Sequence, residues 1–583
     1  MKKKILGCFV IVVLLAVLAA IPLAGYYLYF KPNDEVVPAF AEGELVLVVE
    51  GEKVLSKNSP KILEGEVLLP FDIVKEYFDP HIFWDEALGK VTITTKDRVI
   101  RMKTDKLDAI VNNQPITLNI PVTVENDVVY IPIEFLAEFY GIEVSYVEKS
   151  NVVIIDYKNS IKQIAEPIDP EAVVRKGRSI REPIIRKFDL SSGDTAENTL
   201  RIFEEYDKWY KVRTWDGAIG YIEKRFVVVK KLMVEKISDD KTQKPAWTPP
   251  KGKINLAWDM IYTRREDHSS LGEMKGLDVI SPTWFQVKNA KGELINRAYS
   301  KYVDWAHSRG YQVWALLSND FTDSEMTSKF LNNTDARDNL IREILAYAAL
   351  YNLDGINIDF ENMYISDRDV FTQFVREIAP LLREQGLVVS VDVNDIQCYD
   401  KKALSEAVDY IMYMSYDQHW STSPVAGSVA QVSWQEKIVK RVLEQEGVPR
   451  EKLLLGIPFY TRLWKETVDE SGKKKLTSSA LTMKQAKNLI IENNAKVEWD
   501  EESGQFYAEY TKDNTNYRLW LEDANSINLR TSLVHKYRLA GTCAWSIYFV
   551  SEDIWDVLNK NLKEIESYQE WLEQNRNNQY KFP

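Results

Sequence analysis

The 583-residue sequence predicts an α/β fold, in which a (β/α)8 TIM barrel with a small α+β insertion follows an α+β repeat domain and a small all-β domain. Three observations indicate this organisation. Eight short apolar segments alternate with helical patterns in the C-terminal half. Two N-terminal stretches repeat at a fixed spacing, and a third stretch shows the alternation of a β-hairpin.

The N-terminal segment is strongly apolar. MKKK precedes 26 uncharged residues, Ile5–Phe30, and KPNDE follows them. A helix of that length extends roughly 39 Å, enough to cross a bilayer, and the preceding lysines favour a cytoplasmic N-terminus. Residues 1–34 are therefore predicted to be a cytoplasmic tip and a single-pass membrane anchor, which leaves the remaining chain extracytoplasmic. The alternative is a cleaved signal and a secreted protein, because VLAA at 17–20 offers a cleavage site.

Residues 35–160 are predicted to form an α+β domain of two repeats. VLLPFDIVKEYFDPHIFWDEALGKVTI at 67–93 aligns without a gap with VYIPIEFLAEFYGIEVSYVEKSNVVII at 129–155, an offset of 62 residues. Each copy has the pattern of a strand, a helix that opens at a proline, and a strand hairpin. The pair resembles the copper amine oxidase N-terminal-like (stalk) domains, which implies a spacer or wall-contacting unit. His81 is the single histidine of this region, so no copper site is expected.

Residues 170–232 are predicted to form a small all-β domain. WYKVRTWDGAIGYIEKRFVVV at its end alternates apolar and polar positions around an Asp-Gly turn, as a β-hairpin does. This pattern resembles bacterial Src-homology-3-like (SH3-like) barrels, which implies binding to cell-wall peptides. In the alternative interpretation, Trp209, Trp215 and Tyr221 are core residues without a ligand.

Residues 253–570 are predicted to form the barrel, after a polar linker at 233–252. Its expected strands are INLAWDMI (254–261), LDVISPTWFQV (277–287), YQVWALL (311–317), LDGINIDFEN (353–362), LVVSVDV (387–393), VDYIMYMSY (408–416), KLLLGIPFY (452–460) and LAGTCAWSIY (539–548). Amphipathic helical runs separate the central strands, which is typical of a parallel barrel. An α+β insertion is expected at about 465–538, with a hairpin around Ser503-Gly504, and a short tail at 571–583.

Composition excludes several classes of function. The net charge is −13 and Lys and Arg are not clustered, so nucleic acid is not an expected partner. The five histidines show no HExxH spacing and the three cysteines no paired CxxC, so neither a metal nor another cofactor is expected. Sixteen Trp and thirty Tyr are compatible with large cores or with sugar-binding clefts.

Acidic residues mark the C-terminal end of the fourth predicted strand. In LDGINIDFEN, Asn357, Asp359 and Glu361 alternate with apolar residues, so their side chains share one face of the strand. Catalytic residues of such barrels lie at this end of the strands. Burying two acids there costs free energy unless they are hydrogen-bonded or share a proton, which favours catalysis over a structural polar cluster.

These residues resemble a known motif. Asp354-Gly355-Ile356-Asn357-Ile358-Asp359-Phe360-Glu361 is similar to the DGxDxDxE motif of family 18 glycoside hydrolases, and Met414-Ser415-Tyr416-Asp417 to the family's MxYD. SPTWFQV, GIPFYTRLW and Trp545 fit the second, seventh and eighth strands of that family. The resemblance covers roughly residues 253–570, and the NIDFE variant is similar to the spore-cortex and cell-wall N-acetylglucosaminidase branch.

The resemblance implies a role for each motif residue. Glu361 is expected to be the general acid, Asp359 to bind and stabilise the substrate's 2-acetamido group as its oxygen attacks, and Tyr416 to hold that oxygen. Residues expected to bind the substrate are Asp417, Met414, Trp545, Asn357, Trp284 and Trp464. Trp258 and Trp314 are either sugar platforms or core residues. The family's middle aspartate is Asn357 here, and an amide cannot take a proton shared with Asp359.

The expected function is therefore an extracytoplasmic glycosidase that cleaves β-linked N-acetylglucosamine bonds in peptidoglycan by a substrate-assisted retaining mechanism. Its expected partners are an N-acetylated cell-wall polysaccharide and, through the N-terminal helix, the membrane. The alternatives are a chitinase or chito-oligosaccharide hydrolase, and a non-hydrolytic cell-wall sugar-binding protein.

Overall fold

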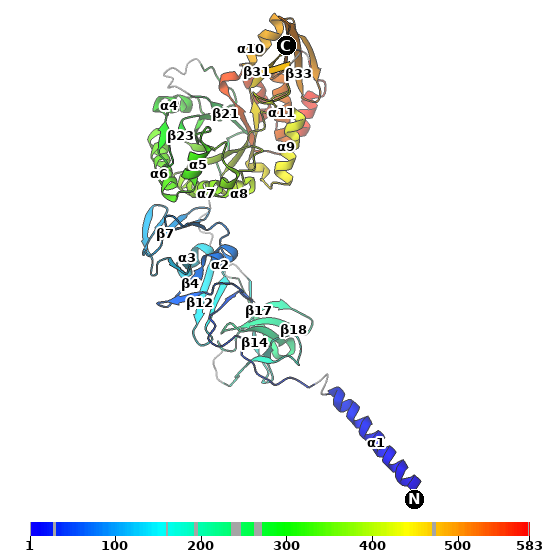
Figure 1. Ribbon diagram of the computed structural model, residues 1–583. Helices are drawn as coiled ribbons and strands as arrows, with labels where there is room; N and C mark the ends of the chain where they lie inside the picture. The colour runs from blue at the N-terminus through cyan, green and yellow to red at the C-terminus, as the bar shows by residue number, and fades with distance from the viewer. Residues whose placement is uncertain are drawn as a thin grey trace. The chain divides into compact units, whose positions relative to one another are not determined.

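A closed parallel barrel dominates the C-terminal part of the computed structural model, which describes residues 2–26, 31–158, 161–191, 196–234, 246–261, 271–468, 474–580 and 582 (Figure 1). Its strands are β21 (Ile254–Asp259), β22 (Val279–Pro282), β25 (Gln312–Ser318), β26 (Gly355–Asp359), β27 (Val388–Val393), β28 (Tyr410–Tyr413), β29 (Leu453–Pro458) and β35 (Gly541–Trp545). Neighbouring strands pair in parallel, and the pairs β22–β25 and β21–β35 close the ring. Seven of these strands lie within the segments where the sequence predicts a strand, and β25 extends one residue beyond its predicted segment.

Helices surround these strands in Figure 1. They are α4 (Ser300–Ser308), α5 (Ser324–Leu331), α6 (Thr334–Tyr351), α7 (Arg368–Glu384), α8 (Lys401–Ala407), α9 (Val432–Glu444), α11 (Ala524–Tyr537), α12 (Asp553–Asn559) and α13 (Tyr568–Asn575), with the short hairpin β23 (Phe285–Val287) and β24 (Leu294–Asn296) after β22. Polar side chains cap several helix starts, because the first N–H groups of a helix need acceptors. Asn333, for example, accepts from Ala336 N at 2.9 Å at the start of α6.

The alternation of β26 separates apolar from polar side chains. Ile356, Ile358 and Phe360 are completely buried in the layer between the strands and the helices, where the Phe360 ring lies 5.5 Å from that of Phe374. Because successive strand residues point to opposite faces, Asn357 and Asp359 point into the barrel. The hydrophobic packing of α7 thus determines which residues face the interior.

A buried ion-pair cluster joins the helices α6 and α7. Arg337 and Glu377 are fully buried and bonded to each other, with Nε to Oε2 at 2.8 Å and Nη2 to Oε1 at 2.9 Å. Arg101 bonds to the same carboxylate at 2.9 Å. Two guanidinium groups therefore compensate one buried carboxylate, as such a burial requires.

The predicted insertion between the last two barrel strands is a small α+β unit. It contains β30 (Tyr460–Val468), β31 (Lys474–Thr482), α10 (Met483–Glu492), β32 (Lys496–Asp500), β33 (Gln505–Lys512) and β34 (Thr515–Leu521), whose strands form one antiparallel sheet. The expected hairpin around Ser503-Gly504 joins β32 and β33, and Gly504 has the positive φ of 65° that this turn uses. The predicted tail is not a separate segment, because α13 crosses its boundary and Tyr580 stacks on Trp499.

The chain divides into two compact units, of which the first comprises residues 1–82, 102–110 and 115–242 and the second the remainder. The N-terminal strands up to residue 157 are β1 (Val46–Val49), β2 (Glu52–Lys53), β3 (Lys61–Leu63), β4 (Glu66–Pro70), β5 (Phe83–Asp85), β6 (Lys90–Thr94), β7 (Val99–Lys103), β8 (Asp108–Val111), β9 (Gln114–Thr117), β10 (Thr123–Glu125), β11 (Val128–Pro132), β12 (Ile142–Val147) and β13 (Val152–Tyr157). The predicted repeat is present: β4 and α2 (Phe71–Tyr77) recur as β11 and α3 (Ile133–Tyr140) at the offset read from the sequence.

A seven-stranded antiparallel sheet follows the repeats. Its strands are β14 (Ile161–Pro167), β15 (Val173–Arg175), β16 (Ile184–Lys187), β17 (Leu200–Glu205), β18 (Trp209–Thr214), β19 (Ile219–Glu223) and β20 (Val227–Val234). The expected Asp216-Gly217 turn joins β18 and β19, and Trp209, Trp215 and Tyr221 are half-buried. The SH3-like resemblance of this unit stays a prediction. Most of the expected linker, residues 235–245, lies outside the described residues.

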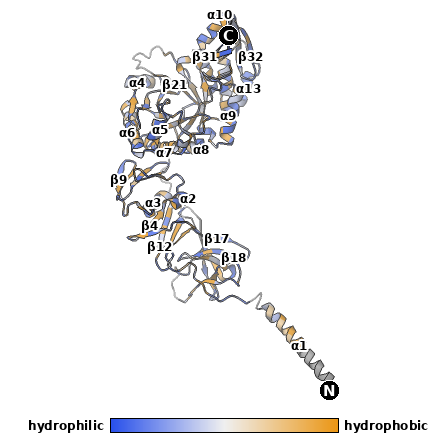
Figure 2. Ribbon diagram, viewed as in Figure 1, coloured by the Kyte–Doolittle hydropathy of each residue, from blue (hydrophilic) through white to orange (hydrophobic). Residues whose placement is uncertain are grey.

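The expectation of a membrane anchor at the N-terminus is wrong. Helix α1 spans Lys2–Gly25, and Figure 2 colours its described part as hydrophobic. A bilayer crossing needs about 20 consecutive apolar residues in one helix. In the part of the chain that the structure describes, no helix is both long and apolar enough to make that crossing.

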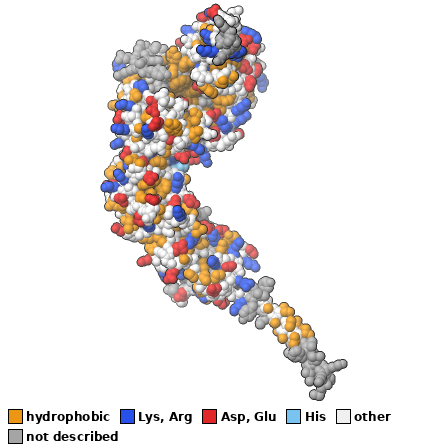
Figure 3. Space-filling view, viewed as in Figure 1, with side chains coloured by type: hydrophobic (Ala, Val, Ile, Leu, Met, Phe, Trp, Pro, Cys, Tyr) orange, Lys and Arg blue, Asp and Glu red, His pale blue; other side chains and the backbone are white. Residues whose placement is uncertain are grey.

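Charged side chains of both signs are interspersed on the face drawn in Figure 3, which agrees with the absence of a basic cluster in the sequence.

Candidate active site

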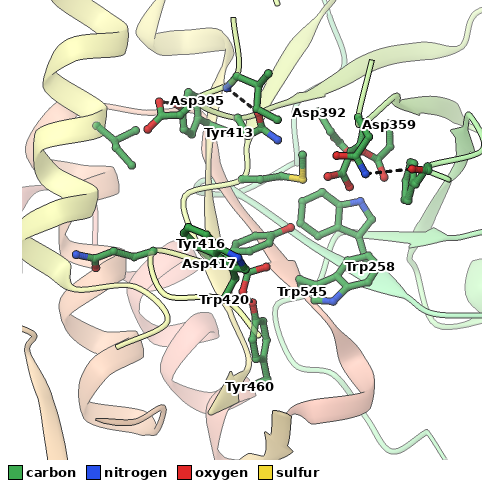
Figure 4. A pocket seen from close by; sticks show the side chains of 18 of the residues that line it. Trp258, Asp359, Asp392, Asp395, Tyr413, Tyr416, Asp417, Trp420, Tyr460 and Trp545 are labelled. Atoms are coloured by element: carbon green, nitrogen blue, oxygen red, sulfur yellow. Dashed lines mark hydrogen bonds between the residues drawn. The ribbon is translucent and has the colours of Figure 1, made fainter. Parts of the chain in front are cut away.

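A cavity of about 790 Å³ opens at the C-terminal ends of the barrel strands. Figure 4 shows the side chains that line it. The structure brings six of the predicted site residues together at its wall: Asp359, Glu361, Met414, Tyr416, Asp417 and Trp545. They come from β26, β28 and β35 or the segments that follow these strands, so the barrel topology assembles residues that are distant in sequence.

Glu361 follows β26 and its carboxyl group faces the cavity. The Asn319 side chain holds its backbone from both sides: Glu361 N donates to Asn319 Oδ1 at 2.9 Å, and Asn319 Nδ2 donates to Glu361 O at 2.8 Å. Burial, together with the negative charge of Asp417, raises the pKa of Glu361. A carboxyl group in this state can carry a proton nearer to neutral pH than an ordinary glutamate.

Asp359 lies deeper than Glu361, with only 6% of its surface exposed. Burial raises its pKa well above the ordinary value, and the charges of Glu361 and Asp392 add to the effect. Its Oδ1 is buried and makes no hydrogen bond to the residues that the structure describes. Within the described residues, this oxygen of Asp359 therefore has hydrogen-bonding capacity that a ligand could use.

Asn357 lies beneath the cavity floor and is completely buried. Its Oδ1 accepts from Trp258 Nε1 at 2.8 Å and from Ser281 Oγ at 3.2 Å, and its Nδ2 donates to Asp392 at 2.6 Å. The structure thus places Asn357 next to the site but not on the surface that a substrate would contact.

Tyr416 and Asp417 follow β28 and face the same cavity. Burial raises the pKa of Tyr416 well above its ordinary value, so its hydroxyl group stays a neutral hydrogen-bond donor. Asp417 has the positive φ of 56°, and its carboxylate accepts from the Tyr460 hydroxyl at 2.6 Å. An aspartate held in left-handed backbone geometry at a cavity is typical of functional positions.

The predicted aromatic platforms divide into two groups. Trp545 is half-buried at the cavity, and its ring lies 6.0 Å from that of Trp258, which also lines the wall. Trp284 is fully buried against Tyr302, and Trp464 is fully buried with its Nε1 bonded to Gly427 O at 2.8 Å. The structure does not bring Trp284 or Trp464 to the cavity, because packing in the core occupies both rings.

Trp314, the remaining platform candidate, is fully buried inside the barrel.

The cavity residues that were not identified from the sequence include Asp392, Trp420 and Tyr460, and the bonding of Asn319 to the Glu361 backbone was not identified either. Asp392 ends the polar alternation of β27, Trp420 is half exposed at the cavity, and Tyr460 begins β30. Asn319 follows the last residue of β25. A search for polar residues directly after every predicted strand would have found Asn319, and the Ser390-Asp392 alternation pointed to Asp392.

Within the described ranges, no group of three or more His, Cys, Asp or Glu side chains is arranged to hold a metal ion.

Comparison with protein families assigns two parts of the chain. The family described as glycosyl hydrolases family 18 matches residues 262–549, and the copper amine oxidase N-terminal domain matches residues 48–155. The barrel is therefore a family 18 glycosyl hydrolase domain, and the protein is a glycosidase.

Several relatives are known from Bacillus subtilis (strain 168). The uncharacterized glycosylase YvbX is 26% identical over 291 residues, which are 47% of this chain and 81% of the relative. The cortical fragment-lytic enzyme is 25% identical over 254 residues, which are 42% of this chain and 58% of the relative, so the chain spans little more than half of that protein. Among solved structures, the spore cortex-lytic enzyme SleL of Bacillus megaterium QM B1551 superposes with a TM-score of 0.48 at 20% identity, over 54% of this chain and 76% of that one.

Proposed function

We propose that this glycosidase cleaves β-linked N-acetylglucosamine bonds in peptidoglycan by a substrate-assisted mechanism that retains the configuration of the anomeric carbon. The observation that carries the proposal is the carboxyl pair at the end of β26. Glu361 faces the cavity with a raised pKa, and Asp359 is buried beside it. Two carboxyl groups in different environments can take different roles in one reaction.

Glu361 is the proposed general acid. Its raised pKa keeps a larger share of the carboxyl group protonated than in an ordinary glutamate at the same pH, so that it can protonate the leaving oxygen as the glycosidic bond breaks. In the second step the resulting carboxylate takes a proton from the water that opens the intermediate. The two hydrogen bonds between the Asn319 side chain and the backbone of Glu361 keep that backbone in place for both transfers.

The proposed nucleophile is the 2-acetamido oxygen of the substrate, as in the family 18 exception to the usual two-carboxylate mechanism. Asp359 accepts a hydrogen bond from the acetamido N–H and stabilises the positive charge that develops on the oxazolinium. Its Oδ1 has no other hydrogen bond among the described residues, which leaves it available for this contact. Tyr416 donates its hydroxyl to the acetamido oxygen. The substrate must therefore carry an N-acetyl group next to the cleaved bond.

The remaining cavity residues are proposed to hold the sugar. The exposed part of the Trp545 ring offers an apolar face to the sugar ring, and Met414 lines the same wall. Asp417 binds sugar hydroxyl groups, since it is the most exposed of these acids and Tyr460 fixes its carboxylate.

Two observations support peptidoglycan as the polymer. A relative is named for the lysis of cortical fragments, and the match to it includes the domain that carries the catalytic pair. The barrel also follows a copper amine oxidase N-terminal domain, a kind of unit proposed above to act as a spacer at the wall. Chitin contains the same N-acetyl group, so it serves as the competing substrate in the test.

The test incubates the full-length protein with purified peptidoglycan and, separately, with chitin oligomers. New reducing ends that disappear in Glu361→Gln are expected, and the first-formed product should have the β configuration by NMR. Glu384→Gln, at the exposed end of α7, makes the same chemical change away from the cavity and should leave the rate unchanged. Tight binding without new reducing ends would refute hydrolysis, and cleavage of chitin oligomers alone would refute the polymer assignment.

A further inference from the structure

Two carboxyl groups on neighbouring strands lie side by side in the barrel. Ile358 of β26 pairs with Val391 of β27, so the next residues along the two strands are Asp359 and Asp392. Paired strands lie about 4.8 Å apart, and both residues point inward. Figure 4 shows the two side chains next to each other at the cavity, and both line it.

The hydrogen bonds of Asn357 determine which oxygen of Asp392 is free. Because Asn357 Oδ1 accepts from Trp258 and Ser281, its Nδ2 must be the group that meets Asp392 Oδ1. An amide N–H can donate only to an oxygen that carries no proton on that side. Asp392 Oδ1 is thus an acceptor, and its other oxygen is the one that can carry a proton.

Among the residues that the structure describes, no cation compensates these two carboxyl groups. The titratable groups that act on or are acted on by Asp392 are Asp359 and Glu361 from β26 and its end, Tyr399 after β27, Tyr416 after β28 and Cys543 on β35. None of them is a lysine or an arginine. Burial and the charge of Glu361 raise the pKa of Asp392 despite the opposing bond from Asn357. Two buried carboxyl groups on paired strands repel each other when both are ionised, which favours a state in which the pair holds one proton.

We infer that Asp392 takes the proton of Asp359 during the reaction and returns it afterwards. Because Asp392 acts through Asp359, it is a positioning residue. The inference rests on the proposed function, in which Asp359 must be an anion beside the oxazolinium. The sequence motif of the family has an aspartate where this chain has Asn357, and an amide cannot store that proton. In this chain the carboxyl group next to Asp359 belongs to Asp392 on the neighbouring strand β27, and a hydrogen bond from Asn357 holds it in place.

The proton transfer balances without another reactant. In the free protein the shared proton is on Asp359. As the acetamido oxygen attacks and the glycosidic bond breaks, this proton moves to the free oxygen of Asp392, and Asp359 becomes the carboxylate that faces the positive charge. When water opens the ring, the positive charge is lost and the proton returns to Asp359. Glu361 gives and regains its own proton separately.

The test exchanges the two polar groups. Asp392→Asn leaves Asp359 without a proton store, and we expect kcat to fall about 10- to 100-fold with KM nearly unchanged. Because Asp392 raises the pKa of Asp359, the limb of the pH profile that reports the pair should move to lower pH. The double variant Asn357→Asp with Asp392→Asn restores one carboxyl group and every hydrogen bond of the pair, and it should recover most of the lost kcat and the original limb.

The inference is overturned if Asp392→Asn keeps the wild-type kcat and pH profile, or if the double variant is no better than the single one. A spectroscopic measurement covers the case in which a variant does not fold. At neutral pH the infrared spectrum of the wild-type protein should contain a buried protonated carboxyl band from this pair in addition to that of Glu361, and the absence of a band that persists in Glu361→Gln contradicts proton sharing. If the wild-type protein shows the band but cleaves no N-acetylated polymer, the proposed function is wrong, while the conclusion that Asp359 and Asp392 share a proton is kept.

Discussion

Removing the Asn319 side chain, which bonds to the Glu361 backbone, offers the sharpest test of how the proposed general acid is positioned. The change is Asn319→Ala, which deletes the two hydrogen bonds to the Glu361 peptide at 2.9 and 2.8 Å and leaves the cavity lining intact. Each bond contributes about 0.5–1.5 kcal/mol, so about 1–3 kcal/mol holds this peptide. If all of it is lost in the transition state, kcat falls about 5- to 150-fold.

The assay measures reducing ends released from purified peptidoglycan by the full-length protein, with kcat and KM obtained separately. We expect the loss in kcat, because substrate contacts of the cavity are unchanged. Asn333→Ala is the matched control: it removes a helix cap at the start of α6, with a stability loss of about 1 kcal/mol, but does not contact Glu361. A kcat for Asn319→Ala within twofold of the wild-type value, at a comparable loss of stability, would show that Asn319 does not position the acid.

Three further changes test other parts of the site and its support. Asp359→Asn should lower kcat by about 100-fold or more, on the scale of losing a charge-stabilising group. Asp417→Asn should move the basic limb of the kcat/KM profile to lower pH, because the charge of Asp417 raises the pKa of Glu361. Glu377→Gln should lower the free energy of unfolding by about 3–5 kcal/mol, since it leaves the buried Arg337 without its carboxylate.

The stability change of Glu377→Gln carries its own pH dependence. Burial opposes ionisation of Glu377, but Arg101 and Arg337 outweigh it and lower the pKa to about 2. A depressed folded-state pKa stabilises the protein above the unfolded value of about 4.3 and loses that effect as the pH falls through about 2. Urea unfolding should therefore show a difference between the two proteins that is largest above pH 5 and shrinks below it. A constant difference contradicts the ion-pair explanation.

The predictions for Asp359→Asn and Asp417→Asn can each be contradicted by one measured result. Turnover of Asp359→Asn near the wild-type rate would remove Asp359 from the mechanism. An unchanged basic limb in Asp417→Asn would show that the Asp417 charge does not reach the acid in solution.

Much of the barrel could be predicted from the sequence, because strand alternation is a local property. The apolar positions of LDGINIDFEN pack against the helices, and its polar positions therefore face inward. The repeat was visible for the same reason, since each copy of strand and helix has its own pattern. The motif residues Glu361, Tyr416 and Trp545 could be placed at one end because parallel strands end together.

What could not be predicted depends on contacts between segments. Trp284 follows the Pro282-Thr283 bend after β22, where alternation no longer tells which way a ring points, and the ring lies in the core. The partnership of Asn357 with Asp392 depends on the register between β26 and β27, which no single segment encodes. Aromatic residues near strand ends are therefore weaker evidence for sugar platforms than acids at strand ends.

The strand β30 has a consequence for any attempt to redesign this protein. Tyr460 is its first residue, and the hydroxyl of Tyr460 orients Asp417, while the same strand runs outward into the sheet of the insertion. The lobe between the last two barrel strands and the tyrosine that orients Asp417 are thus parts of one continuous strand. An engineer who trims that lobe to widen access for bulky polymers would also loosen a carboxylate of the proposed sugar site, so shortening should begin beyond Trp464, which does not line the cavity.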